Sequence, residues 1–189
     1  MLEFMSGKLA LRIKRIVPEH PASATVLKFA IAVILNALFI IGLTLVLSLL
    51  TGRTKETIQI LISFALLRQV SGGLHLKSGM ACVLFTATLF TFLSFIKAGD
   101  TMILLMNGIS LLIVLWLAPI GIERQTRIPR QHWPKLKVIA VMLVMANVVA
   151  GSPVIAASFL AQSISLLIAR RGVRTENEGV TGSTTHSSV

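Results

Sequence analysis

The stretch that decides the fold is residues 22–50, which read ASATVLKFAIAVILNALFIIGLTLVLSLL. Its only charged side chain is Lys28, close to the start of the run. A helix needs about 20 apolar residues to cross the hydrocarbon core of a bilayer, whereas a cleaved signal peptide has an apolar core of only about 7–15 residues. The stretch therefore predicts a membrane-spanning helix.

The same apolar character continues along most of the chain. Of its 189 residues, 54% are hydrophobic and only 13% are charged. Further apolar runs occupy residues 57–70, 79–96, 101–120, 135–150 and 154–169. These runs lack the alternation of lipid-facing strands, which favours helices over a barrel. We expect an all-α polytopic membrane protein with about six transmembrane helices, the second of which (57–70) is short enough to be re-entrant instead.

The two ends of the chain differ from this apolar middle. Residues 1–17 place apolar and basic side chains on different helical faces, which is typical of an amphipathic helix lying in the headgroup region. The apolar face holds Leu2, Met5, Leu9, Ile13 and Ile16, and the basic face holds Lys8, Arg12 and Arg15. Residues 171–189 are rich in Ser, Thr and Gly and predict a disordered cytoplasmic tail. Residues 18–170 between them form one six-helix membrane domain.

The net charge of +11 would suggest a nucleic-acid partner on a soluble protein. In a membrane protein it indicates the positive-inside rule and contact with anionic membrane lipids, so no nucleic acid is expected. If both termini are inside, the outer side keeps only Arg53, Lys55 and Lys97, and the inner side takes the other fifteen of the 18 Lys and Arg. This bias predicts six spans with cytoplasmic termini.

Residues 68–82, RQVSGGLHLKSGMAC, contain the single cysteine, Cys82, and one of the four histidines, His75. One cysteine excludes an internal disulfide and gives no zinc spacing, so neither a metal nor a cofactor is expected. A nearby imidazole and a helix N-terminus both favour a reactive thiolate. We expect Ser78 to cap the following helix, with Cys82 about one turn inside it.

The spacing between the two residues sets a condition on this chemistry. In one continuous helix, residues seven apart are separated by roughly 10.5 Å along the axis. The chain must therefore fold back between His75 and Cys82, which Gly72, Gly73 and Gly79 allow. The sequence permits a Cys–His dyad at the cytoplasmic face but does not require one. A lone Cys is often an apolar filler, a lone His is often solvated, and a Gly-Gly pair is often a plain turn.

These residues resemble the accessory gene regulator protein B family. Arg68, Gly73, His75 and Cys82 fit the pattern R-x-x-x-G-G-x-H-x(6)-C. A second feature agrees, because residues 117–120 (LAPI), followed by a basic segment to Ile128 and Pro129, are similar to the loop that follows a membrane span in that family. The likeness runs from the first span to the sixth.

The resemblance implies a cysteine endopeptidase of the bacterial cell membrane that processes a quorum-sensing propeptide, with residues 18–170 as its peptidase domain. Cys82 would be the nucleophile and His75 the base. Cleavage of the propeptide's C-terminal tail would leave an acyl-thioester on Cys82, which an internal Cys or Ser of the propeptide would open to close a thiolactone or lactone. The resemblance also implies a homodimer, although no sequence feature demands one.

The supporting roles stay open on the sequence alone. Arg68 either holds a substrate carboxylate, stabilises the glycine loop formed by Gly72 and Gly73, or anchors the inner side. Three further arginines either attract an acidic propeptide tail or contact lipid, namely Arg124, Arg127 and Arg130. Glu123 or Gln69 could orient His75, and no spacing selects between them.

Four amide side chains lie within the predicted spans and are expected to form hydrogen bonds between helices: Asn36, Asn107, Asn147 and Gln162. Together with the basic inner face they also fit an alternative function, a non-enzymatic transporter or an export partner for a small peptide. A third alternative is a membrane-bound regulator that senses lipid through residues 1–17.

Overall fold

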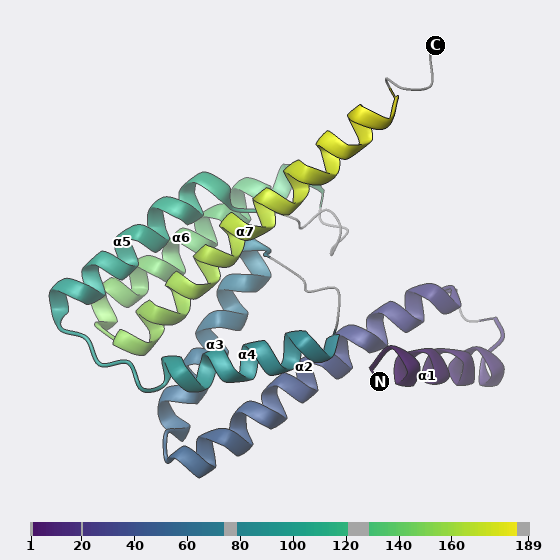
Figure 1. Cartoon of the computed structure of the whole chain (residues 1–189), viewed down its shortest axis with the longest axis horizontal. Helices are drawn as coiled ribbons and strands as arrows, with labels where there is room; N and C mark the ends of the chain where they lie inside the picture. Colours follow the sequence, from purple (N-terminus) through teal and green to yellow (C-terminus); the bar gives the residue numbers. More distant parts are fainter. Residues whose placement is uncertain (1, 20, 74–78, 121–128, 185–189) are drawn as a thin grey trace. The chain divides into compact units, whose positions relative to one another are not determined.

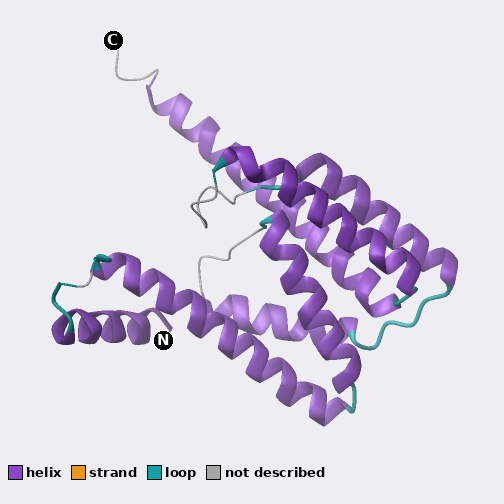
Figure 2. Ribbon diagram, turned by 180° about the vertical axis from the view of Figure 1, so that it is seen from behind, coloured by secondary structure: helices purple, strands orange, loops and turns teal. Residues whose placement is uncertain are grey.

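The computed structural model describes residues 2–19, 21–73, 79–120 and 129–184. Within these ranges the chain is all-α, as predicted, and Figure 2 shows its helices joined by loops. The elements are α1 (Leu2–Ile16), α2 (Ala24–Thr51), α3 (Thr54–Ser71), α4 (Gly79–Leu93), α5 (Asp100–Leu117), the 3-10 turn η2 (Arg130–His132), α6 (Trp133–Ala150) and α7 (Pro153–Thr184).

Four of these helices are long and apolar enough to cross a membrane: α2, α5, α6 and residues Pro153–Arg171 of α7. Helix α4 is apolar but has only 15 residues, about 22 Å at 1.5 Å per residue. Helix α3 has 18 residues and is absent from those four, because it begins with polar side chains and carries Arg68 near its end. The chain is a membrane protein, and the count of six spans stays a prediction.

The chain divides into two compact units, each of which is described by itself. The first unit comprises residues 1–58 and 76–94, and the second comprises residues 59–75 and 95–189. The first unit therefore contains α1, α2, α4 and the start of α3. The rest of α3 lies in the second unit with α5, α6 and α7.

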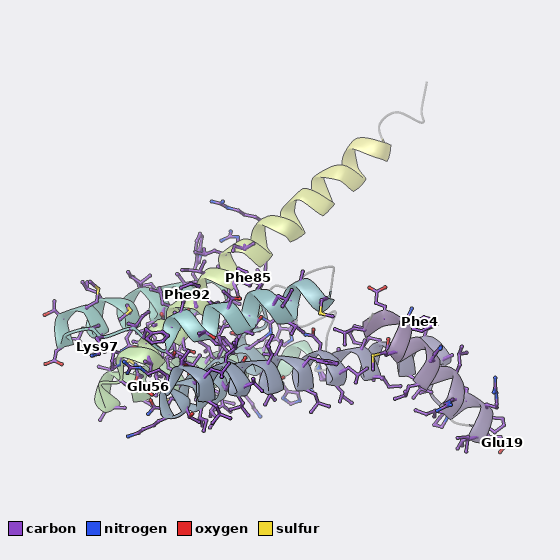
Figure 3. All side chains as sticks on the ribbon, turned by 60° about the horizontal axis from the view of Figure 1, so that its bottom comes forward. Phe4, Glu19, Glu56, Phe85, Phe92 and Lys97 are labelled. Atoms are coloured by element: carbon purple, nitrogen blue, oxygen red, sulfur yellow. The ribbon has the colours of Figure 1, made fainter. Side chains whose placement is uncertain are left out.

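In the first unit, α2 contacts both α1 and α4, and α1 lies alongside it in Figure 1. Ser23 caps the start of α2 by accepting a hydrogen bond from the Val26 N–H at 3.3 Å. Its end is closed by Gly52, whose φ of 67° is left-handed. On α4, Phe85 and Phe92 are 63% and 71% exposed and project from one face of the helix (Figure 3). Such exposed aromatic faces are typical of lipid contact.

Helix α1 covers residues 2–16 of the predicted amphipathic segment. Its side chains Lys8, Arg12 and Arg15 are exposed, and Leu2, Ser6 and Ala10 are buried against the protein. Of the predicted apolar stripe, Leu2 is buried, whereas Leu9 and Ile16 are exposed. The small residues Ser6 and Ala10 face the protein because they let two helices approach closely. Whether α1 lies in the headgroup region stays a prediction.

In the second unit, α5 packs against both α6 and α7, and the three helices run side by side in Figure 1. Their core takes one residue from α3, Leu67, and is completed by Val114, Leu117, Ala118, Ala140, Val144, Phe159 and Leu166. A hydrogen bond between two hydroxyl groups joins α3 to α7: Ser63 of α3 donates to Ser158 of α7 at 3.0 Å. Helix α7 continues to Thr184, so it enters the segment 171–189 that was predicted to be a disordered tail, whose last five residues lie outside the described residues.

Three of the four span-borne amides form hydrogen bonds to protein groups as predicted, and two of these three, Asn107 and Asn147, bond to each other. Asn147 donates to the Asn107 carboxamide at 3.2 Å and also bonds to the backbone of Ser152, which closes the turn between α6 and α7. Gln162 of α7 bonds to the end of α3. The fourth amide, Asn36, contacts the cysteine.

Candidate active site

Cys82 is the fourth residue of α4 and lies about one turn from the start of that helix, as predicted. It is half-buried at the contact between α2 and α4. Asn36 of α2 places its Nδ2 atom 3.8 Å from the sulfur, within hydrogen-bond reach of a thiol or thiolate. The first N–H groups of a helix lack intrahelical partners, so the surroundings of Cys82 offer donors to negative charge.

The start of α4 is closely packed by α1. A Cβ atom on Gly79 would lie 3.1 Å from the Leu2 Cδ1 atom and 3.7 Å from the Asn36 Oδ1 atom. Leu2 is only 5% exposed, so the first turn of α1 is fixed against the first turn of α4. The N-terminal helix therefore packs against the first residue of the helix that carries Cys82, a contact that the sequence did not indicate.

His75 lies outside the described residues, as do Ser78 and Leu74. Cys82 belongs to the first unit and His75 to the second. The Cys82–His75 dyad therefore stays a prediction. The same holds for Arg124 and Arg127, and for Glu123 as a third member, all of which lie outside the described residues. Arg130 begins η2, and its side chain lies outside the described part of the chain.

The glycine pair before His75 adopts backbone conformations that favour glycine. Gly72 has a φ of 78° and Gly73 a φ of 143°. A Cβ atom on Gly73 would lie 3.0 Å from both the Gln162 Nε2 and the Ser165 Oγ atoms, and 3.3 Å from an Arg68 guanidinium nitrogen. Side chains thus pack directly against the backbone of this glycine pair, and the predicted reversal between His75 and Cys82 stays a prediction.

Gln162 anchors this glycine turn from inside α7. Its side chain is fully buried and donates to the Gly72 carbonyl at 2.6 Å and to the Ser71 hydroxyl at 3.2 Å. Its Oε1 atom accepts a hydrogen bond from Ser165 at 3.1 Å. A buried amide with both ends bonded fixes the direction in which the chain leaves α3 toward His75.

A second segment pairs with the same turn. The Ile120 N–H donates to the Ser71 carbonyl at 3.0 Å, and Gly72 and Ile120 form an isolated parallel bridge. The 117–120 segment (LAPI) after α5 therefore lies against the end of α3. Two sequence features that are separated by about 45 residues meet in the second unit.

A family model described as accessory gene regulator B matches residues 6–169. The chain belongs to this family. A curated relative named putative AgrB-like protein, from Halalkalibacterium halodurans, is 30% identical over 137 residues, which cover 72% of this chain and 70% of the relative. No solved structure matches.

Membership of the accessory gene regulator B family supports a role in accessory gene regulator peptide processing. The match covers the glycine turn, Cys82 and the LAPI segment. Arg68 lies against Gly73 in this arrangement, which agrees with a role in stabilising the glycine turn. Sequence reasoning assigned Gln162 to helix packing in general and missed that it holds this turn, although a polar amide in an apolar helix was a detectable signal.

The anchoring role of Gln162 predicts a clear stability effect. Gln162→Leu is expected to lower the free energy of unfolding by about 1–3 kcal/mol, because the Gly72 carbonyl and the Ser71 hydroxyl lose their buried donor. Thermal unfolding in detergent micelles measures this loss. Ser163→Ala is the control on the same helix, since its single bond to the Ser110 carbonyl is long at 3.4 Å. Equal midpoints for the two variants would contradict the anchoring role.

Proposed function

We propose that this chain is a membrane-embedded cysteine endopeptidase. It removes the C-terminal tail of a quorum-sensing propeptide and promotes closure of the remaining peptide to a thiolactone or lactone. The observation that carries the proposal is the setting of Cys82 in a member of this family. The one cysteine of the chain lies in the first turn of an apolar helix with a carboxamide at 3.8 Å from its sulfur.

The first step is formation of an acyl-enzyme. His75 takes the proton of the Cys82 thiol, and the thiolate attacks the backbone carbonyl carbon at the end of the future ring. Collapse of the tetrahedral intermediate breaks the C–N bond, and the leaving amine takes a proton from the imidazolium of His75. The products are the free tail and a thioester on Cys82. N–H groups at the start of α4 are suited to stabilise the oxyanion.

The second step closes the ring. An internal thiol or hydroxyl of the propeptide attacks the thioester carbonyl, and His75 accepts its proton. The C–S bond to Cys82 breaks and the thiolate is released. Because the thioester conserves the activation of the acyl group, ring closure needs no ATP and the reaction needs no cofactor.

Charge at one end of the second unit supports an orientation for this reaction. Arg170 stacks over Trp116 with 4.3 Å from its guanidinium carbon to the ring centroid, and Arg68 lies near the turn that pairs with Ile120. These contacts bring Arg68 in the last turn of α3 and Arg170 near the middle of α7 to the end of α5 that precedes the basic segment. We infer that this end and both termini are cytoplasmic. Arg124, Arg127 and Arg130 then attract an acidic propeptide tail, and the enzyme acts as a homodimer.

The test is reconstitution with the propeptide. The purified chain in liposomes is incubated with a candidate propeptide, a short peptide with a central Cys or Ser and an acidic tail, and the products are identified by mass spectrometry. The proposed function predicts a released tail and a peptide whose mass is lower by the tail alone, with no water added to the ring segment. Transport of intact peptide across the bilayer without cleavage would favour the alternative of a transporter.

A further inference from the structure

Asn36 provides the polar contact to the sulfur from across a helix interface. It lies on α2, 46 residues from Cys82, and its neighbours along the chain are apolar on both sides. Its Nδ2 atom is 3.8 Å from the Cys82 Sγ atom. Within the described residues no other hydrogen bond of the Cys82 side chain is recorded, so the carboxamide is the group that can respond to the charge of the sulfur.

The other end of the same carboxamide is left without a partner. Its Oδ1 atom is buried and accepts no hydrogen bond within the described part of the chain. The atom lies beside the first residue of α4, 3.7 Å from where a Cβ on Gly79 would be. Buried acceptors without a donor are costly and rare, and those that persist commonly serve a function.

The bonding partner of Asn36 sets it apart from the packing amides elsewhere in the chain. In the Asn107–Asn147 pair, Asn147 is bonded at both ends of its carboxamide, whereas the Asn107 Nδ2 atom has no partner within the described residues, so an unpaired end alone does not single out Asn36. The hydrogen bond that Asn36 makes in the described part of the chain goes to the sulfur of Cys82. An asparagine used only to join α2 to α4 would be better satisfied with a hydroxyl or carbonyl opposite it.

We propose that Asn36 is the positioning residue that holds the nucleophile ready; this inference rests on the proposed function. A thiolate only accepts hydrogen bonds, so the amide end of Asn36 faces it and stabilises it. Asn36 thus acts on Cys82 before substrate arrives.

Alkylation of Cys82 by iodoacetamide tests this contact without any substrate. Cys82 is the one cysteine of the chain, so every adduct on the purified protein in detergent reports on it. Asn36→Leu and Asn36→Asp both remove the donor, and Asp also keeps the size of the side chain. Both are expected to react about tenfold more slowly at pH 7, because the sulfur loses the hydrogen bond that stabilises its nucleophilic form.

The matched control is Thr44→Val. Thr44 is buried on the same helix and donates to the Ile40 carbonyl at 2.6 Å, so this change removes a span-borne polar group that does not touch Cys82. It should alkylate like the wild type. Circular dichroism and the thermal midpoint check that each variant is folded. If Asn36→Leu does not fold, Asn36→Asp is used for the comparison instead. A wild-type alkylation rate in a folded Asn36 variant would overturn the proposal.

Processing of the propeptide separates the failure of this proposal from the failure of the proposed function. With the wild-type chain active, Asn36→Leu should lower kcat, whereas Thr44→Val should leave it unchanged. If alkylation is slower in the Asn36 variants but the wild type itself releases no tail, the contact between Asn36 and Cys82 holds and the peptidase function is rejected.

Discussion

Replacing Cys82 with alanine is expected to abolish release of the propeptide tail. The His75→Ala variant should lose nearly as much activity, at least about a thousandfold, because nucleophile and base act as one unit. For the same reason the double variant should be no slower than either single one. Mass spectrometry of reconstituted reactions measures the released tail over time.

His132→Ala is the control for this pair. His132 is not a member of the proposed dyad. It occupies the N-cap position at the start of α6, and its ring Nε2 atom lies 3.4 Å from the Gln131 Nε2 atom. Its activity should equal that of the wild type. Tail release at the full rate by either Cys82→Ala or His75→Ala would exclude the cysteine mechanism and return attention to an export function.

Gly73→Ala is expected to have the second largest effect. The methyl group would meet the Gln162 and Ser165 side chains at 3.0 Å, and the φ of 143° disfavours any side chain. The turn that leads to His75 must then move, and a shift of about 1 Å in a catalytic group can reduce the rate about a hundredfold. We expect processing to fall by about that factor. Gln162 should also lose its short bond to Gly72, so the thermal midpoint should fall.

Gly151→Ala separates backbone strain from crowding. Gly151 also has a left-handed φ, 63°, but a Cβ there would meet nothing within 4 Å. This variant should lose about 1–2 kcal/mol of stability from strain alone and keep its processing activity. If Gly73→Ala behaved in the same way as Gly151→Ala, the packed glycine turn would have no part in positioning His75.

Much of the fold could be predicted from apolar periodicity and length. The run at residues 22–50 became α2, and the apolar runs after Asp100 became α5, α6 and the first part of α7. The start of α3 was less predictable, because its first residues are polar; local bonds at this end join the Thr57 N–H to the Arg53 carbonyl and the Arg53 side chain to Glu56. The contact of α1 with the protein was not predicted, since helix packing buries Ser6 and Ala10 there together with Leu2.

The candidate site was predictable in its residue types and not in its contacts. The glycines, Cys82 and the LAPI segment could be identified because each type has a distinctive chemistry. The bonds from Gln162 to Ser71 and from Asn36 to Cys82 join residues 91 and 46 positions apart, and no local pattern specifies them. These bonds form only when particular helix faces meet, and the packing of each unit decides which faces those are.

The most direct measurement of the central claim is the intact mass of the enzyme after reaction with a propeptide whose ring-closing Cys or Ser is replaced by alanine. Without that nucleophile the acyl-enzyme cannot cyclise and should accumulate. We predict that the protein gains the mass of the propeptide minus its tail, that the adduct maps to Cys82, and that hydroxylamine removes it as expected for a thioester. Tail release with no adduct on Cys82, at any time in the reaction, would contradict covalent catalysis by this cysteine.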